Sequence, residues 1–199
     1  MPTPTLDFWF EFASTYSYPA AMRIAPLAEA AGVAVRWRPF MLGPIFKAQG
    51  WTTSPFNLYP AKGRNMWRDL ERICGALDLP FVQPKSFPQN TLLAARVALV
   101  GLAEIWGEDF CRAIYRLEFG EGRNVEELGT IADVLRSLGL DTRVVLDRAQ
   151  SSEIKSQLRA NTEEAQRLDI FGSPTSITAD GELFWGNDRL EAALDWARR

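Results

Sequence analysis

Large apolar and polar residues alternate near the start of the chain. Within residues 5–12 every second side chain is apolar, at Leu6, Phe8, Phe10 and Phe12. This period of two predicts a β-strand, with Trp9 and Glu11 on its other face. The alanine-rich residues 18–31 follow and stop before Gly32, so they predict a helix closed by a glycine in the left-handed conformation. Pro26 lies inside this helix and predicts a kink.

Residues 33–38 form a second alternating run that Pro39 ends, and they complete a predicted β-α-β unit. After Gly43 the pattern changes: Pro, Gly and aromatic residues fill residues 44–60, and apolar residues at helical spacing then dominate up to about Asp169. One stretch of this part, TLLAARVALVGLAEIW, is apolar nearly all round, as in a helix buried on most sides. The middle of the chain is therefore predicted to be all-helical.

Short strands return near the end of the chain. Residues 175–178 and 183–185 flank the dipeptide Asp180-Gly181, which predicts an antiparallel hairpin. Two residue pairs have the spacing of helix caps, Asn124 with Glu127 and Asp188 with Glu191, and the second pair opens a final helix.

The predicted order is β-α-β, a helical block, then β-β-α, which is the arrangement of the thioredoxin fold. The predicted class is therefore α/β and thioredoxin-like. Residues 1–43 and 170–199 are expected to form the thioredoxin-like domain, and residues 44–169 a large all-helical insertion between its two halves.

Composition limits the possible partners. A chain of 199 residues with 47% hydrophobic residues can bury a core of its own. A net charge of -3 leaves no basic face for phosphates, so nucleic acid is not an expected partner. No apolar run reaches the roughly 20 residues of a membrane helix, and the first residues lack a secretory pattern. The protein is therefore expected in the cytoplasm, away from membranes.

The chain has no histidine and only two cysteines. Ser-His-Asp and Cys-His triads cannot form, and a metal site is not expected because the common zinc sites lose their main ligand. Cys74 and Cys111 each lie within an amphipathic helical pattern, which favours two buried thiols over a disulfide. Catalysis would have to use hydroxyls, carboxylates, Lys, Arg or a bound cofactor.

The turn at residues 14–17 joins the first strand to the first helix and reads Ser-Thr-Tyr-Ser. Ligands of open α/β sheets bind beyond the carboxyl ends of the strands, where this turn lies. Redox members of the fold hold Cys-x-x-Cys here, because the helix dipole lowers the pKa of a thiol. Serines at both positions exclude disulfide exchange by this turn, although a ligand could bring its own sulfur.

Two further loops carry candidate binding residues. Ser173-Pro174 precedes a strand, either as a rigid strand entry or as a cis proline beside a backbone that pairs with an extended peptide. Asn187 and Asp188 open the last helix, either as a plain cap or as a site for the carboxylate and ammonium groups of a ligand.

Five stretches together resemble the 2-hydroxychromene-2-carboxylate isomerase family, which is related to kappa-class glutathione transferases. They are FEFASTYSY, YPAKGRNMWRDLER, FPQNTLLAARVAL, FGSPT and FWGNDRLE, in the order and spacing of that family over nearly the whole chain. The resemblance implies a thioredoxin fold with a helical insertion, bound glutathione and a homodimer.

The resemblance also implies roles for single residues. The Ser14 hydroxyl is expected to bond the glutathione sulfur and stabilise its thiolate. Pro19 separately indicates that the helix starts late, with Ser17 as its cap. The backbone of Ser173, next to Pro174, is expected to pair with the cysteine of glutathione. The other expected contacts are Tyr16, Ser17, Asn57, Lys62, Asn187 and Asp188. Two departures from the family pattern are Thr15, where a proline is frequent, and the stretch GWTTSPFNLYP, in which Asn57 stands for a family asparagine.

The sequence therefore predicts a glutathione-dependent isomerase of an aromatic unsaturated carboxylic compound, acting by reversible addition of the thiolate. Aromatic residues suit such a small planar substrate, unless they belong to the core: Tyr16, Tyr18, Phe40, Trp51 and Trp67. Two alternatives stay open. One is a kappa-class-like transferase that conjugates glutathione to an electrophile, and the other is a non-catalytic peptide-binding protein that uses the Ser173-Pro174 face.

Overall fold

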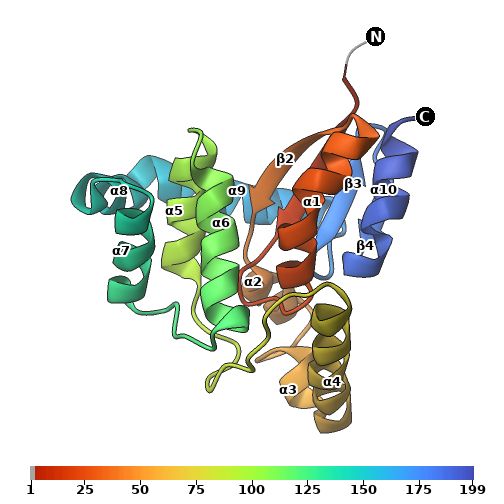
Figure 1. The fold of residues 1–199 in the computed structure, drawn as a ribbon, viewed down its shortest axis with the longest axis horizontal. Helices are drawn as coiled ribbons and strands as arrows, with labels where there is room; N and C mark the ends of the chain where they lie inside the picture. The colour runs from red at the N-terminus through yellow and green to blue at the C-terminus, as the bar shows by residue number, and fades with distance from the viewer. Residues whose placement is uncertain (1–2) are drawn as a thin grey trace.

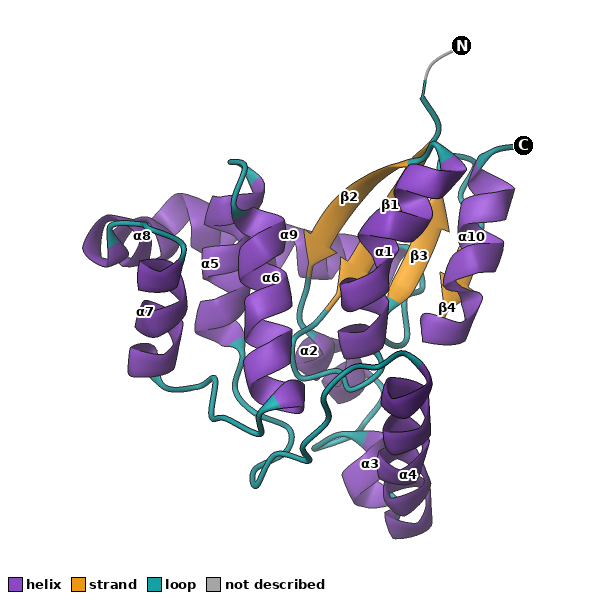
Figure 2. Cartoon of the chain, in the orientation of Figure 1, coloured by secondary structure: helices purple, strands orange, loops and turns teal. Residues whose placement is uncertain are grey.

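The computed structural model describes residues 3–199 and contains one four-stranded sheet with the order β2-β1-β3-β4 (Figures 1 and 2). Strand β1 (Thr5–Phe10) pairs in parallel with β2 (Ala34–Pro39) and antiparallel with β3 (Thr175–Thr178). Strand β3 pairs antiparallel with β4 (Leu183–Trp185). The predicted parallel unit, the hairpin and the thioredoxin-like class are confirmed.

The crossover between β1 and β2 is helix α1 (Ser17–Ala31), which ends where the glycine signal predicted. Gly32 has a φ of 66°, and its N–H donates to the carbonyl of Glu29. Pro26 lies inside the helix. Helix α1 packs beside the C-terminal helix α10 (Leu190–Ala197) on one side of the sheet (Figure 1).

Helices make up the chain between β2 and β3, as predicted. They are α2 (Leu42–Ala48), α3 (Pro55–Leu58), α4 (Pro60–Ala76), α5 (Leu92–Leu102), α6 (Gly107–Tyr115), a π-helical turn (Arg116–Gly120), α7 (Leu128–Ser137), α8 (Thr142–Ala149) and α9 (Ser152–Arg167). The division at residues 43 and 170 stays a prediction, and residues 1–2 of its first segment lie outside the described residues. Within residues 3–199, no helix combines the length and hydropathy needed to cross a bilayer.

The helical segment lies in two places relative to the sheet. Helices α5 to α9 group together beside β2, whereas α3 and α4 pack on each other beyond the end of β1 (Figure 1). Helices therefore lie on two sides of the end of the sheet (Figure 2).

Both faces of the central strand β1 are buried. Phe8 and Phe10 are fully buried against α1 and α6, with their ring centroids 5.9 Å apart. On the other face Trp9 is also buried, in a second cluster with Phe40 and Ile45. The alternation correctly predicted a strand, but the second face is covered by α2 and α9 and does not face water.

Two predicted caps are wrong. Helix α7 begins after Glu127, and the Asn124 side chain instead accepts the N–H of Glu126 at 3.0 Å, as in a turn. At the last helix, Asn187–Arg189 forms a 3-10 turn before α10, and the Asp188 side chain makes no capping bond. Short polar side chains bond nearby backbone in turns as readily as at caps, so spacing alone did not separate the two.

Candidate active site

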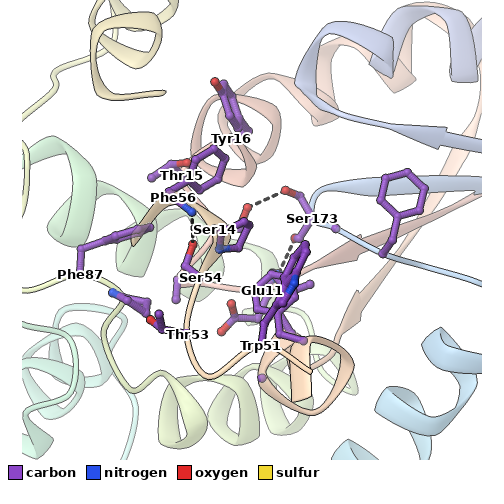
Figure 3. A pocket seen from close by; sticks show the side chains of 18 of the residues that line it. Glu11, Ser14, Thr15, Tyr16, Trp51, Thr53, Ser54, Phe56, Phe87 and Ser173 are labelled. Atoms are coloured by element: carbon purple, nitrogen blue, oxygen red, sulfur yellow. Dashed lines mark hydrogen bonds between the residues drawn. The ribbon is translucent and has the colours of Figure 1, made fainter. Parts of the chain in front are cut away.

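A cavity of about 1220 Å³ lies where β1 ends and β3 begins. Its wall combines the turn after β1, α2 and the loop after it, α4, the loop before α5, the loop before β3 and the loop after β4. Figure 3 shows Ser14 of the turn after β1 next to Ser173 of the loop before β3, joined by a hydrogen bond. The position agrees with the expected ligand site beyond the strand ends.

Ser14 lies on the turn between β1 and α1 and lines the cavity with 9% of its surface exposed. Its N–H donates to the carbonyl of Glu11 at 3.0 Å, and its carbonyl accepts the N–H of Ser17 at 3.1 Å. The Ser14 Oγ donates to the carbonyl of Ser173 at 2.6 Å (Figure 3). The hydroxyl proton is thus held by the opposite loop, at the edge of the cavity.

Ser17 does not cap α1, so this prediction is wrong. Tyr16 occupies the cap position and makes no side-chain capping bond, because the helix already begins at Ser17. The Ser17 side chain is fully buried, with its Oγ 2.7 Å from the Oγ of Ser173. The same Ser173 Oγ accepts the N–H of Glu11 at 3.0 Å. Ser17 therefore anchors the loop before β3 from behind and does not line the cavity.

The Ser173-Pro174 peptide bond is cis, which is the second of the two alternatives for this loop, and Ser173 contacts the turn at residues 14–17. Ser173 lines the cavity. The Pro174 carbonyl accepts the N–H of Gly186 at 2.9 Å, and Pro174 does not line the cavity. Of these two predicted contacts, Ser173 alone reaches the cavity.

Asn187 and Asp188 both line the cavity, beyond the end of β4. Arg23 of α1 donates to the Asn187 Oδ1 at 2.9 Å and to the Asn187 carbonyl at 2.7 Å. Arg23 also pairs with Glu191, and this hydrogen bond lowers the pKa of the Glu191 carboxyl. The Asn187 Oδ1 is therefore occupied by Arg23. Asp188 is exposed and pairs with Arg189 at 3.3 Å.

Tyr16 lies on the same turn as Ser14 and lines the cavity next to α4. Its hydroxyl donates to the Asp69 carboxylate at 3.1 Å, and its ring lies 6.3 Å from that of Phe56. Burial, together with the Asp69 charge, raises the pKa of the Tyr16 phenol, which therefore stays protonated at neutral pH.

Lys62 and Asn57 are both predicted contacts of glutathione, but only Lys62 lines the cavity. Lys62 lines the cavity, with its Nζ 5.7 Å from the ring centroid of Tyr59. Asn57 does not line the cavity. Its amide donates to the Thr53 Oγ1 at 3.3 Å and to the Phe87 carbonyl at 3.2 Å, so it joins two loops of the wall.

Aromatic rings line the cavity, but most are not those expected. Tyr16 and Trp51 lie on the wall, whereas Tyr18 and Phe40 are fully buried and Trp67 packs against the core. The other lining rings are Phe46, Phe56, Phe87, Phe171 and Trp185. Three of these belong to the stretches FPQN, FGSPT and FWGN, so their place next to predicted contacts was the signal that could have identified them.

Glu11 is a wall residue that the sequence analysis missed. Only 6% of its surface is exposed, and the Thr91 Oγ1 donates to its carboxylate at 2.5 Å. Burial raises the pKa of Glu11 to about 7, although the hydrogen bonds from Thr91 and the Ala13 backbone oppose the rise. The available signal was a carboxyl residue placed directly before the serine turn.

Both cysteines are buried, as predicted, and neither lines the cavity. Burial raises the pKa of Cys74 to about 11 and that of Cys111 well above its usual value. Neither thiol is therefore a nucleophile at neutral pH. No group of three or more His, Cys, Asp or Glu side chains is placed to hold a metal in the part of the chain that the structure describes.

Comparison with known proteins places this geometry in a family. Residues 5–195 match the DSBA-like thioredoxin domain. The chain is 29% identical, over 95% of both proteins, to a 2-hydroxychromene-2-carboxylate isomerase of Sphingobium xenophagum. It is 28% identical to glutathione S-transferase kappa 1 of Caenorhabditis elegans, over 96% of this chain and 90% of that protein. A solved structure of a 2-hydroxychromene-2-carboxylate isomerase has a TM-score of 0.86 at 26% identity, over 96% of this chain and 95% of the other.

Proposed function

Because the chain belongs to the DSBA-like thioredoxin domain family, we propose that it uses the active-site turn of this fold to bind glutathione. The activity is the isomerisation of an aromatic unsaturated carboxylic compound. The observation that carries the proposal is the hydrogen bond between Ser14 and Ser173 on the cavity wall. Among residues 3–199, no cysteine lies on this wall. The similarity to 2-hydroxychromene-2-carboxylate isomerases supports the reaction class.

The residues of the wall fit glutathione, a tripeptide with an ammonium group, two carboxylates and a thiol. The wall carries two ammonium groups, at Lys47 and Lys62, and two surface carboxylates, at Asp69 and Asp188. Small-molecule pockets commonly measure roughly 300–1,000 Å³. The cavity of about 1220 Å³ therefore has room for a tripeptide and an aromatic substrate together.

Each wall residue has a defined part in this proposal. The Ser173 backbone would pair with the peptide, and the Ser14 hydroxyl would turn from the Ser173 carbonyl to the sulfur. The amino end of α1 favours negative charge at this point. When bound, glutathione supplies a thiolate that adds reversibly to a conjugated carbon, which lets the former double bond rotate.

The remaining predicted contacts divide into two groups. Lys62, Asn187 and Asp188 would hold the charged ends of the peptide, and Tyr16 would border it. Ser17, Asn57 and Pro174 would act only through the loops that they support, since they do not line the cavity. The lining rings, among them Trp51, Phe171 and Trp185, would pack on the planar substrate.

A thiolate titration tests the proposal. The protein is mixed with glutathione, and the ultraviolet absorbance of the thiolate is followed as the pH rises. A bound thiol with a pKa below that of free glutathione is expected, because Ser14 and the α1 amino end favour the charged form. S-methylglutathione, which has no thiol, serves as the blank. A bound thiol pKa equal to or above the free value contradicts the proposal.

Transfer of glutathione to an electrophile is a second candidate, favoured by the similarity to glutathione S-transferase kappa 1 along nearly the whole chain. Product analysis with an aromatic unsaturated acid separates the two activities. Transfer consumes one glutathione for each product, whereas isomerisation returns it.

The proposal includes a homodimer, which the resemblance implies, and a location in the cytoplasm. Sedimentation of the purified chain tests the dimer. A single species with the mass of one 22.4 kDa chain at micromolar concentration would remove the dimer from the proposal.

A further inference from the structure

Two buried carboxyl groups, those of Glu11 and Glu118, interact near the turn at residues 14–17, and the proposed function uses neither. Glu11 lies on the turn after β1 and lines the cavity. Glu118 lies on the π-helical turn after α6 and is fully buried. The Tyr115 hydroxyl donates to the Glu11 carbonyl at 3.0 Å and so fixes that helix end against the turn. The two carboxyl groups lie close enough for the Glu11 charge to act on Glu118.

The two groups differ in their hydrogen bonds. Glu11 accepts from Thr91 and from the Ala13 backbone, and both bonds stabilise its charged form. The two carboxylate oxygens of Glu118 have no partner among residues 3–199. Burial, the Glu11 charge and the Glu126 charge raise the pKa of Glu118 well above its usual value. Glu118 is therefore the neutral member of the pair, and Glu11 is the member that ionises near neutral pH.

No other group on the wall does the same work. The remaining charged side chains there are Lys47, Lys62, Asp69 and Asp188, and the two carboxylates among them already pair with Tyr16 and with Arg189. The chain has no histidine, the side chain that ordinarily exchanges protons near pH 7. Glu11 is three residues before Ser14, whose N–H donates to the Glu11 carbonyl at 3.0 Å.

We propose that Glu11 is the proton acceptor of the site, whose carboxylate takes the proton of the ligand thiol and returns it when the thiol leaves. The S–H bond breaks and leaves its electron pair on sulfur, while an O–H bond forms on the Glu11 carboxylate. Ser14 then only holds the charge of the sulfur. This inference rests on the proposed function, because it requires a thiol ligand in the cavity.

Calorimetry of glutathione binding tests the inference. Titrations at pH 8 in two buffers with different enthalpies of ionisation give the number of protons released to solvent. The wild-type protein is expected to release fewer protons per thiolate formed than Glu11→Gln, because the negative charge of the thiolate raises the pKa of Glu11 in the complex and its carboxyl then keeps part of the proton. Glu11→Gln is expected to release about one proton per thiolate formed. Thiolate absorbance, recorded in parallel, shows how much thiolate each protein holds.

Two further variants keep the test decisive. Glu118→Gln replaces a neutral acid by a neutral amide, so its proton count should equal that of the wild type. Thr91→Val removes a bond that lowers the pKa of Glu11. Thr91→Val should therefore begin to release protons at a higher pH than the wild type does. This variant replaces Glu11→Gln in the test if Glu11→Gln does not fold.

The outcomes separate the inference from the proposed function. Absence of thiolate in the wild-type complex overturns both. A wild-type complex that holds the thiolate but releases as many protons as Glu11→Gln overturns the inference alone. The same holds if Glu118→Gln changes the proton count as much as Glu11→Gln does, or if Thr91→Val causes no pH shift.

Discussion

Replacing Ser14 by alanine measures how much its hydroxyl contributes to the proposed thiolate site. In the structure the single hydroxyl proton is donated to the Ser173 carbonyl at 2.6 Å. To serve a thiolate, the hydroxyl must give up this bond, which as a neutral hydrogen bond contributes about 0.5–1.5 kcal/mol. A hydrogen bond to a charged group contributes about 1.5–3 kcal/mol. The difference, roughly 1–2 kcal/mol, corresponds to a shift of about one pKa unit.

The expected result is therefore a bound thiol whose pKa is about one unit higher in Ser14→Ala than in the wild type. Thiolate absorbance against pH measures this shift. Ser17→Ala is the matched control, because Ser17 also bonds Ser173 but does not line the cavity. It should lower the free energy of unfolding by about 1 kcal/mol and leave the thiol pKa unchanged. No shift in Ser14→Ala, or an equal shift in Ser17→Ala, would refute the reasoning.

Three further changes test other parts of the structure. The pKa of Glu118 is higher in the folded protein than in the unfolded chain. Its contribution to stability is therefore fully present below the pKa of the unfolded chain and is lost as the pH rises through the pKa of the folded protein. The free energy of unfolding of Glu118→Gln should therefore equal that of the wild type near pH 4 and exceed it by about 1–3 kcal/mol at pH 8. Urea titrations at both pH values measure the difference. An unchanged pH dependence would count against a buried carboxyl at this position. In Gly107→Ala the new Cβ would lie 2.3 Å from the Gly101 backbone, so it should cost about 3 kcal/mol or more of unfolding free energy. The control is Gly129→Ala, whose new Cβ meets nothing within 4 Å and which should be neutral or stabilising by up to about 1 kcal/mol. Equal effects of Gly107→Ala and Gly129→Ala would show that α5 and α6 are not in close contact. In Gly172→Ala the new Cβ would lie 2.4 Å from the Trp185 Nε1 and displace this half-exposed ring at the cavity wall. Affinity for an aromatic acid, followed by tryptophan fluorescence, should fall several-fold while that for glutathione stays within about twofold; equal losses for both would show that Trp185 does not belong to the aromatic part of the wall.

Local signals in the sequence identified most of the fold. The alternation around Phe8 and Phe10, the glycine at Gly32 and the Asp180-Gly181 turn are read from neighbouring residues, and all three are confirmed. The side of the strand that faces water is not a local property. Trp9 and Glu11 alternate with the core residues, yet both are buried, Trp9 by residues of α2 and α9 and Glu11 next to Thr91.

The site shows the same division. The resemblance and the position of the strand ends predicted that Ser14 and Ser173 lie at the same site, and in the structure the two residues are hydrogen-bonded. The partner of Ser17 lies 156 residues away and the partner of the Glu11 carboxylate 80 residues away. No spacing rule reports such pairs, so a cap was assigned to Ser17 and no role to Glu11. Asn57 is a similar case, since its partner Phe87 follows on a loop 30 residues later.

The two buried thiols make the chain its own reporter of local opening. Cys74 lies on α4 and Cys111 on α6, and no other cysteine competes for a thiol reagent. A reagent therefore labels each position only when the surrounding helix detaches, and the two labelling rates follow the helices separately. Slower labelling of Cys74 with a ligand bound would show that the cavity holds α4 in place, without any added probe.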